Sequence, residues 1–172
     1  MGTSKTSGKS SKSSSPKSDG KTVKETRQKF QRLSVIVFSG DPLDLPETRH
    51  TGLYIEHLNE DGSIIGRNFL HVTGSAGIFQ REESIERNPT GSELFTGSVH
   101  VATIVATGSS DRRLRNAIWA TPVNNAEYDW NCQSWVGDAL TSCVNAGLIS
   151  TEQRDMAIDG MAELILQATD MA

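Results

Sequence analysis

The strongest constraint on the fold is a β-hairpin signal in the first half of the chain. Residues 50–58 and 64–72 are both rich in β-branched and aromatic side chains, and Asp61-Gly62, a favoured two-residue turn, lies between them. If Asp61-Gly62 forms the loop, His71 pairs with Gly52. His50 and His71 then share one face of the hairpin, with Cβ atoms ~7–8 Å apart or less, and His57 lies on the other face.

A second constraint is a helix that begins at a cysteine. After Asn131, apolar residues recur every three or four positions as far as Gly147, which predicts an amphipathic helix. Asn131 is the expected N-cap, and it places Cys132 at the first helical position. Unpaired N–H groups and the helix dipole favour negative charge there, so we expect a stabilised, reactive thiolate. The alternative is an inert cysteine that acts as a small buried hydrophobe.

The remaining patterns predict one α+β domain over residues 33–172, with an antiparallel sheet packed against helices. The small-residue segment 74–77 is expected to be a loop, and the charged segment 81–93 a surface excursion. The other predicted elements are strands at 33–39 and 98–106, a helix from a cap at Ser109-Ser110-Asp111 to about Trp119, and a closing helix opened by the capping box Ser150-Thr151-Glu152-Gln153.

Residues 1–32 form a basic, Ser/Lys-rich segment that is expected to be a disordered tail. It carries seven Lys and two Arg against two acidic residues, a net charge of +7, whereas the rest of the chain carries −11. The tail could be a solvated spacer, a polybasic patch for anionic lipid or nucleic acid, or half of a two-signal membrane anchor. The third interpretation has a specific motif, because Gly2 fits the N-myristoylation pattern and a lysine cluster is a suitable second signal.

The sequence predicts an intracellular, cytoplasmic protein, peripherally bound to membrane if the tail is an anchor. No apolar core of a secretory signal and no membrane-spanning stretch is present. Cys132 and Cys143 lie on one predicted helix about 16 Å apart, too far for a disulfide. No zinc-type cysteine spacing occurs, and no cofactor or metal is expected. Nucleic acid is not the favoured partner, because the body is acidic and lacks interleaved aromatic and basic residues.

The cysteine and two of the histidines together suggest acyl transfer. A cysteine becomes an effective nucleophile when a histidine accepts its proton and a third group orients that histidine. We assign these roles to Cys132, His50 and His71. The alternative is that both histidines are hydrogen-bonded polar residues at strand ends.

The candidate site residues and the segments around them resemble those of a known fold. The strand His50-Thr51-Gly52-Leu53-Tyr54-Ile55, followed later by Asn131-Cys132 at a helix start, resembles the circularly permuted papain-like (NlpC/P60-like) fold. The His-Thr strand and the loop Gly74-Ser75-Ala76-Gly77-Ile78 are similar to the PPPDE family of desumoylating or deubiquitinating isopeptidases. The His50 and Tyr54 spacing, a second histidine at His71, and Asn131-Cys132 resemble the lecithin retinol acyltransferase-like thiol acyltransferases and phospholipases.

The resemblance covers roughly residues 49–146 and implies a cysteine-dependent hydrolase, of peptidase or isopeptidase type, acting on a protein or lipid acyl substrate. Cys132 would be the nucleophile and His50 the base. Gln133-Ser134-Trp135 departs from the Glu-His-Phe that usually follows the acyltransferase cysteine. The alternatives are a thiol acyltransferase or phospholipase, and a non-catalytic binding module on the same fold. The expected substrate groove comprises Tyr54, Trp130, Asn131, Gln133 and Trp135.

Overall fold

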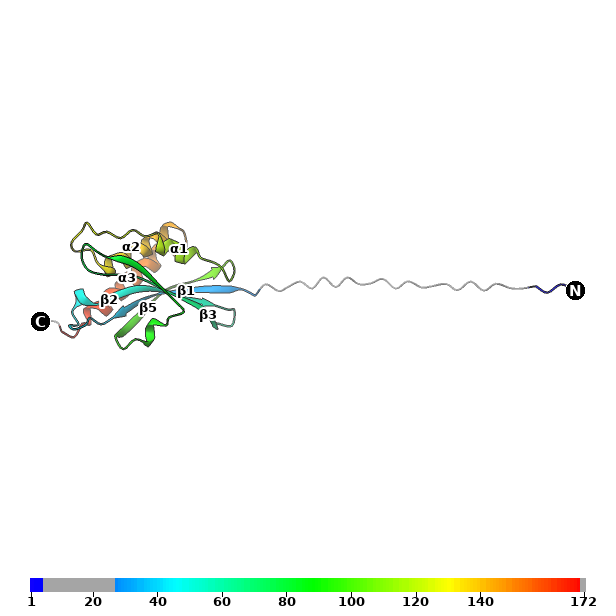
Figure 1. The fold of residues 1–172 in the computed structure, drawn as a ribbon, viewed down its shortest axis with the longest axis horizontal. Helices are drawn as coiled ribbons and strands as arrows, with labels where there is room; N and C mark the ends of the chain where they lie inside the picture. Colours follow the sequence, from blue (N-terminus) through cyan, green and yellow to red (C-terminus); the bar gives the residue numbers. More distant parts are fainter. Residues whose placement is uncertain (5–26, 171–172) are drawn as a thin grey trace.

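The structure is a computed structural model that describes residues 1–4 and 27–170. A five-stranded antiparallel sheet, in the order β4-β3-β2-β1-β5, packs against three helices. The helices cover one face of the sheet (Figure 1). This confirms the predicted α+β class. The elements are β1 (Lys29–Phe38), β2 (His50–Leu58), β3 (Ile64–Thr73), β4 (Gln80–Ile85), β5 (Phe95–Ala106), α1 (Arg113–Trp119), α2 (Cys132–Asn145) and α3 (Thr151–Leu166), with short 3-10 helices η1 (Pro46–Thr48) and η2 (Pro89–Gly91).

The predicted hairpin is present as β2 and β3, with the predicted register through most of its length. Gly52 pairs with His71, and His57 pairs with Gly66. The turn differs from the expectation: the N–H of Asn59 donates to the carbonyl of Ser63 at 2.9 Å, and Gly62 adopts a positive φ of 80°. The loop therefore has three residues instead of two. A register shift between His57 and Leu58 absorbs the extra residue.

The two faces of the sheet differ in what they bury. Side chains alternate along each strand, so odd-numbered residues of β1 and β2 point to the helices and even-numbered ones point away. The side toward the helices, here called the helix face, contributes aliphatic residues such as Val35, Leu53 and Leu70, all fully buried in the main core. The other side, here called the open face, carries a smaller cluster built on Ile36, Tyr54 and Phe69.

Two helices, α2 and α3, start at the predicted caps, whereas the N-cap of α1 is Arg112 and makes no side-chain cap. The Asn131 side chain accepts hydrogen bonds from the N–H groups of Gln133 and Ser134, at 2.9 and 3.2 Å. Ser150 opens α3 with the predicted capping box. In α1 the carboxylate of Asp111 accepts from the N–H of Arg113. The predicted strand at 98–106 is present as the longer β5.

Two boundaries predicted from the sequence are wrong. β1 begins at Lys29, four residues before the expected strand start at Leu33, because its first residues already pair with β2 and β5. The charged segment after Gln80, expected to be a surface excursion, begins with β4, which pairs with β3 at the sheet edge. Its charges suit an edge strand, where one side of the ladder faces solvent.

Most of the predicted tail lies outside the described residues, because positions 5–26 are not described. Gly2 belongs to the short described stretch 1–4 and is exposed. Its acylation, and the binding of anionic membranes by the lysine-rich segment, stay predictions. No helix in the described part of the chain is long and apolar enough to span a membrane.

Candidate active site

Cys132 is the first residue of α2, as the sequence predicts. The helix starts there because Asn131, in extended conformation, turns the chain and caps the first turn with its side chain. The cap takes up the N–H groups of Gln133 and Ser134. Among the described residues the N–H of Cys132 donates to no other residue, so it remains available to an anionic group at the helix start.

His50 and His71 meet, as the hairpin register predicts. The Nε2 of His50 lies 2.7 Å from the Nδ1 of His71, a hydrogen bond between two imidazoles. Each ring also packs on an aromatic neighbour of the open face, His50 stacked on Phe38 and His71 against Phe69. These contacts fix both rings, so the orientation of His50 is set by His71 and Phe38 together.

The three predicted residues line a single cavity of about 500 Å³. It lies at the end of the hairpin away from the turn, where β2 begins and β3 ends. Beside Cys132, His50 and His71, its walls include the expected groove residue Asn131 and a set of η1 and loop residues: Glu47, Thr48, Arg49, Val72, Thr73, Gly74 and Phe79. The cavity thus joins the start of α2 to the open end of the hairpin.

The thiol and the imidazole of His50 are not hydrogen-bonded in the described structure. The Cys132 thiol instead donates to the carbonyl oxygen of Arg49, with Sγ and oxygen 3.8 Å apart. The strand alternation explains this arrangement, because Thr51 points to the helices and His50 points to the open face. Cys132 and His50 therefore approach the cavity from opposite faces of the sheet.

The pKa of the Cys132 thiol is raised above its ordinary value, which corrects the sequence-based expectation of a stabilised thiolate. Burial is the largest cause, and the nearby polar groups of Thr51, Gln133 and Cys132, which favour a thiolate, oppose it without overcoming it. Burial also raises the pKa of Cys143, to about 12. Both cysteines are free, in agreement with the absence of a predicted disulfide.

Both imidazoles are held neutral. Burial, with a contribution from His71, lowers the pKa of His50 to about 4. Burial likewise lowers the pKa of His71. Near neutral pH the resting site therefore contains a thiol and two neutral imidazoles, and not a thiolate-imidazolium pair.

Thr51 is a site residue that the sequence analysis missed. It is fully buried beneath the start of α2, and among the described residues its hydroxyl oxygen has no hydrogen-bond partner. The sulfur of Cys132 is the group that Thr51 would stabilise as a thiolate. The sequence signal was its place directly after His50, which puts it on the side facing α2.

Four of the expected groove residues do not line the cavity. Trp135 is fully buried in the core, and Trp130 is 6% exposed, with its indole N–H donating to Asp138 at 3.1 Å. Their apolar surface is used for packing under α2, because both rings point inward from the helix start. Tyr54 lies on the open face in a different pocket. Gln133 donates to the carbonyls of Pro46 and Arg49, at 2.8 and 3.1 Å.

The segment before His50 is anchored by a buried ion pair. Arg49 is 3% exposed and binds the carboxylate of Asp44 through two nitrogens, at 2.6 and 2.8 Å. The Arg49 guanidinium also donates to the carbonyls of Leu164 and Gln167 near the end of α3. The Arg49 hydrogen bond lowers the pKa of Asp44 well below its usual range. This network holds in place the cavity wall that receives both the thiol and the Gln133 amide.

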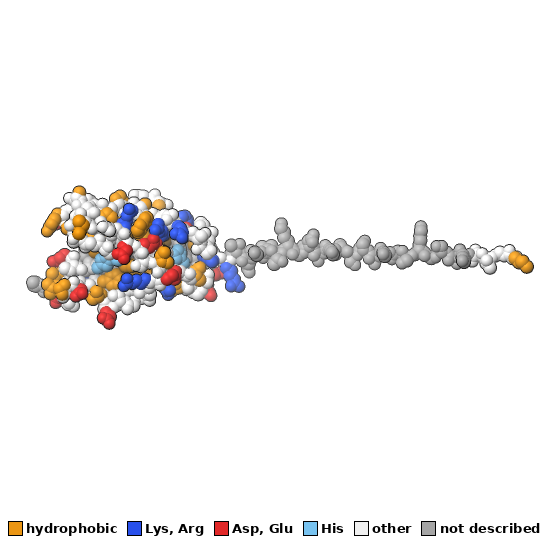
Figure 2. Space-filling view, viewed as in Figure 1, with side chains coloured by type: hydrophobic (Ala, Val, Ile, Leu, Met, Phe, Trp, Pro, Cys, Tyr) orange, Lys and Arg blue, Asp and Glu red, His pale blue; other side chains and the backbone are white. Residues whose placement is uncertain are grey.

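Within residues 1–4 and 27–170, no group of three or more His, Cys, Asp or Glu side chains is arranged to hold a metal ion. The surface of the folded body shown in Figure 2 intersperses acidic and basic side chains. The chemical groups that border the cavity include a thiol, two imidazoles and the polar start of α2.

The fold and site define an α+β protein with a Cys-His-His cavity at one end of its sheet. Residues 41–150 match the model of a family of unknown function (DUF6540), and the chain belongs to this family. The match contains the hairpin, both histidines and the whole of α2. Comparisons with curated proteins and with solved structures gave no match.

Proposed function

We propose that this protein is a cysteine-dependent hydrolase, with a permuted papain-like arrangement of sheet and helix. The observation that carries the proposal is the convergence of Cys132, His50 and His71 from three separate elements on one cavity. Two independent sequence features favour this convergence: the hairpin register brings the two histidines together, and the Asn131 cap sets Cys132 at the helix start. The resemblance to thiol isopeptidases and acyltransferases assigns the same residues.

The hydrogen bond between the two histidines determines which ring nitrogen of the proposed base is free to accept a proton. The Nε2 of His50 is engaged with the Nδ1 of His71, so only the Nδ1 of His50 is free to accept a proton. His50 then carries its proton on Nε2 and donates to His71, and His71 carries its own on Nε2. When His50 becomes an imidazolium, it still donates to a neutral acceptor. His71 is therefore the orienting group in this mechanism.

Attack proceeds by general base catalysis from a neutral pair. The sulfur turns from the Arg49 carbonyl toward the cavity, forms a bond to the substrate carbonyl carbon, and gives its proton to His50. His50 returns that proton to the leaving amine or alcohol as the carbonyl C–N or C–O bond breaks. Water, deprotonated by His50, then cleaves the thioester and restores the thiol. The free N–H of Cys132 is placed to bind the developing oxyanion.

A second candidate, a non-catalytic binding module on the same fold, is favoured by two specific observations. The Cys132 pKa is raised, and its thiol contacts a backbone carbonyl in place of His50. In that case the cavity binds a ligand without bond cleavage. The two candidates differ in whether Cys132 is ever acylated.

The deciding experiment is to trap the acyl-enzyme. The full chain is incubated with three substrate classes, peptide amides, lysine isopeptides and lipid esters, and its mass is followed by mass spectrometry with peptide mapping. We expect an acyl adduct on Cys132 with one class and none on Cys143, the buried control. The reactive class separates isopeptidase from lipid hydrolase or acyltransferase chemistry.

Variants test the assigned roles. Cys132→Ser should lower kcat by at least about 100-fold, and His50→Ala by about 10²–10⁴-fold, the range for losing a general base. His71→Ala should lower kcat less and change the pH profile, because it acts through His50. Retained turnover in Cys132→Ser, or an absence of adducts with all three classes, would contradict the hydrolase and leave the binding module.

A further inference from the structure

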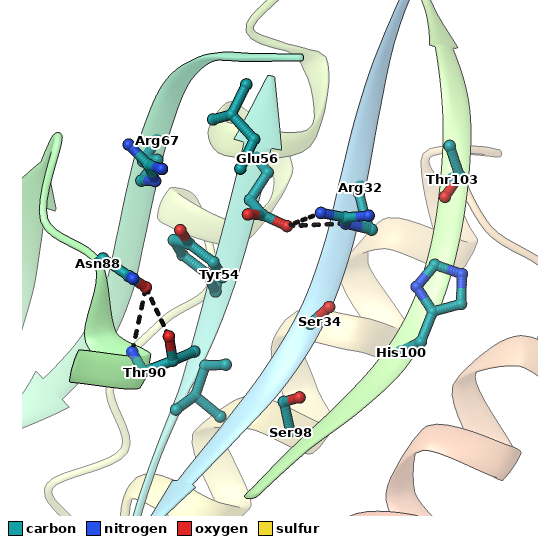
Figure 3. Close-up of a pocket in the computed structure, with 12 residues that line it drawn as sticks. Arg32, Ser34, Tyr54, Glu56, Arg67, Asn88, Thr90, Ser98, His100 and Thr103 are labelled. Atoms are coloured by element: carbon teal, nitrogen blue, oxygen red, sulfur yellow. Dashed lines mark hydrogen bonds and ion pairs between the residues drawn. The ribbon is translucent and has the colours of Figure 1, made fainter. Parts of the chain in front are cut away.

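A second pocket lies on the open face of the sheet, away from the helices. Residues of β3, β2, β1 and β5 line it, and Figure 3 shows the helices behind the sheet. Its volume is about 650 Å³, and it shares no lining residue with the Cys132 cavity. Two rows of paired residues form its floor: Tyr54, Ser34 and His100 in one, and Arg67, Glu56, Arg32 and Thr103 in the other.

The pocket contains polar atoms without partners. Tyr54 is 4% exposed and lies beside the Arg67 and Glu56 side chains, but within the described parts of the chain its buried hydroxyl oxygen has no partner at hydrogen-bond distance and angle. The same holds for the buried Nε of Arg67 on the neighbouring strand. Burial raises the pKa of Tyr54, so the phenol keeps its proton and is a donor. Buried donors that the protein leaves unsatisfied are unusual and call for an acceptor.

The charges of the pocket do not cancel. Its charged lining residues are Arg32, Arg67 and Glu56, and Glu56 is already paired with Arg32 at 2.6 Å. Among the described residues Arg67 forms no ion pair, although Glu56 lies opposite it in the strand register. One guanidinium charge is therefore left over beside the Tyr54 hydroxyl. Guanidinium groups bind carboxylates and phosphates through paired hydrogen bonds.

The rest of the rim offers hydroxyl and amide groups. Ser34, Ser98 and Thr103 lie on β1 and β5, and Asn88 and Thr90 border the pocket from η2 (Figure 3). His100 adds an exposed ring on the same side. These groups suit a ligand that carries hydroxyls beside its anionic group.

We propose that this pocket binds a small hydroxyl-bearing anion, a phosphate or a carboxylate, whose charged oxygens are held by Arg67 and Tyr54. The site is separate from the Cys132 cavity, so the proposal does not depend on the hydrolase assignment. Arg32 stays paired with Glu56 and supports the floor, and the serine and threonine hydroxyls face the hydroxyls of the ligand.

The test is a titration of the full chain with inorganic phosphate, ribose 5-phosphate and gluconate, followed by NMR of the Arg67 Nε–H signal and by calorimetry. We expect a saturable shift of that signal. Ribose 5-phosphate should bind more tightly than inorganic phosphate, because it adds contacts to the hydroxyl rim. Comparison with gluconate distinguishes a phosphate site from a carboxylate site.

Three variants make the result specific. Arg67→Gln should weaken binding about tenfold or more, the loss of a charge-assisted pair. Ser98→Asp, which adds a negative charge on an exposed strand position of the pocket, should also weaken it. Arg154→Gln is the matched control, since Arg154 lies on α3 and pairs with Asp155. Absence of saturable binding for all three probes, or binding unchanged in both Arg67→Gln and Ser98→Asp, would overturn the proposal.

Discussion

The two faces of the sheet are built for different purposes. The helix face is filled with fully buried aliphatic side chains, and its few polar groups, such as Gln31 and Thr51, are enclosed. The open face has only a small apolar cluster, flanked by the histidine pair at one end and by the arginine-lined pocket at the other. The face that does not form the main core is therefore the one that bears the histidine pair and the arginine-lined pocket.

The Cys132 cavity is where the two faces meet. Cys132 comes from a helix on one side, and the histidine rings come from the other side, so they can share a cavity only where the strands end. This explains why the candidate base stands at the first position of β2. Histidines of the open face further along the strand would be separated from α2 by the sheet itself.

The largest expected effect is on the helix face. Trp135→Ala should reduce the free energy of unfolding by about 3–5 kcal/mol, because it removes a fully buried indole from the main core. Phe95→Ala, on the partly buried rim of the open-face cluster, should cost clearly less. Urea unfolding of both variants measures the difference. Equal losses would mean that the two faces contribute alike to stability.

The next effect is a pH dependence that originates at the histidine pair. The pKa of His50 falls from 6.5 to about 4 on folding, so between these values the unfolded chain binds more protons. Stability is therefore complete above pH 6.5 and declines as the pH falls toward 4, by about 3 kcal/mol for this group. Chemical unfolding from pH 4 to 7 should show this slope, and His50→Gln should flatten it. An unchanged slope in that variant would mean that groups other than His50 cause the pH dependence of stability.

A smaller effect is expected from removing helix caps, and it distinguishes a cap that only stabilises its helix from one that also positions Cys132. Asn131→Ala and Ser150→Ala each remove the side-chain cap of a helix and should each destabilise by about 1 kcal/mol. Only Asn131→Ala should also change the alkylation rate of Cys132 by iodoacetamide, because only α2 begins at the thiol. Thermal unfolding and mass spectrometry of the two variants measure these effects. The same alkylation rate in both would show that the cap does not position the sulfur.

The smallest expected effect is on the open face. Tyr54→Phe removes a buried hydroxyl that lacks a partner in the described structure, so the free energy of unfolding should change by no more than about 0.5 kcal/mol. The same change should weaken anion binding in the arginine-lined pocket. Unfolding and calorimetry of one variant thus distinguish a structural tyrosine from a binding one. A loss of several kcal/mol would show that the hydroxyl is satisfied in solution.

The sequence predicted those parts of the fold that depend on local rules. The pairing of Gly52 with His71 followed from the turn signal, and the start of α2 followed from the Asn131 cap. The predicted register of the hairpin is correct although the predicted two-residue loop is not. The actual loop has three residues, and a shift between His57 and Leu58 restores the predicted pairing. β4 was missed because its exposed edge position allows charged residues where strand patterns expect apolar ones.

The sequence could not predict properties that depend on three-dimensional packing. The aromatic residues Trp130, Trp135 and Tyr54 were recognised as prominent, but which of them pack and which border a pocket depends on neighbours far apart in the chain. The direction of the Cys132 pKa was wrong for the same reason. A helix start stabilises a thiolate locally, whereas the opposing burial comes from the strand packed against the helix.

Arg49 connects the end of the chain to the candidate nucleophile. Its guanidinium is held by carbonyls near the end of α3, and its own carbonyl accepts hydrogen bonds from the Cys132 thiol and the Gln133 amide. Fraying of the last turn of α3 would remove two acceptors of the guanidinium and leave Asp44 as its remaining partner. The end of the closing helix therefore helps to position the carbonyl that accepts the thiol hydrogen bond. Any ligand or modification that shifts the fraying equilibrium of that helix end would change how often the sulfur is free to react.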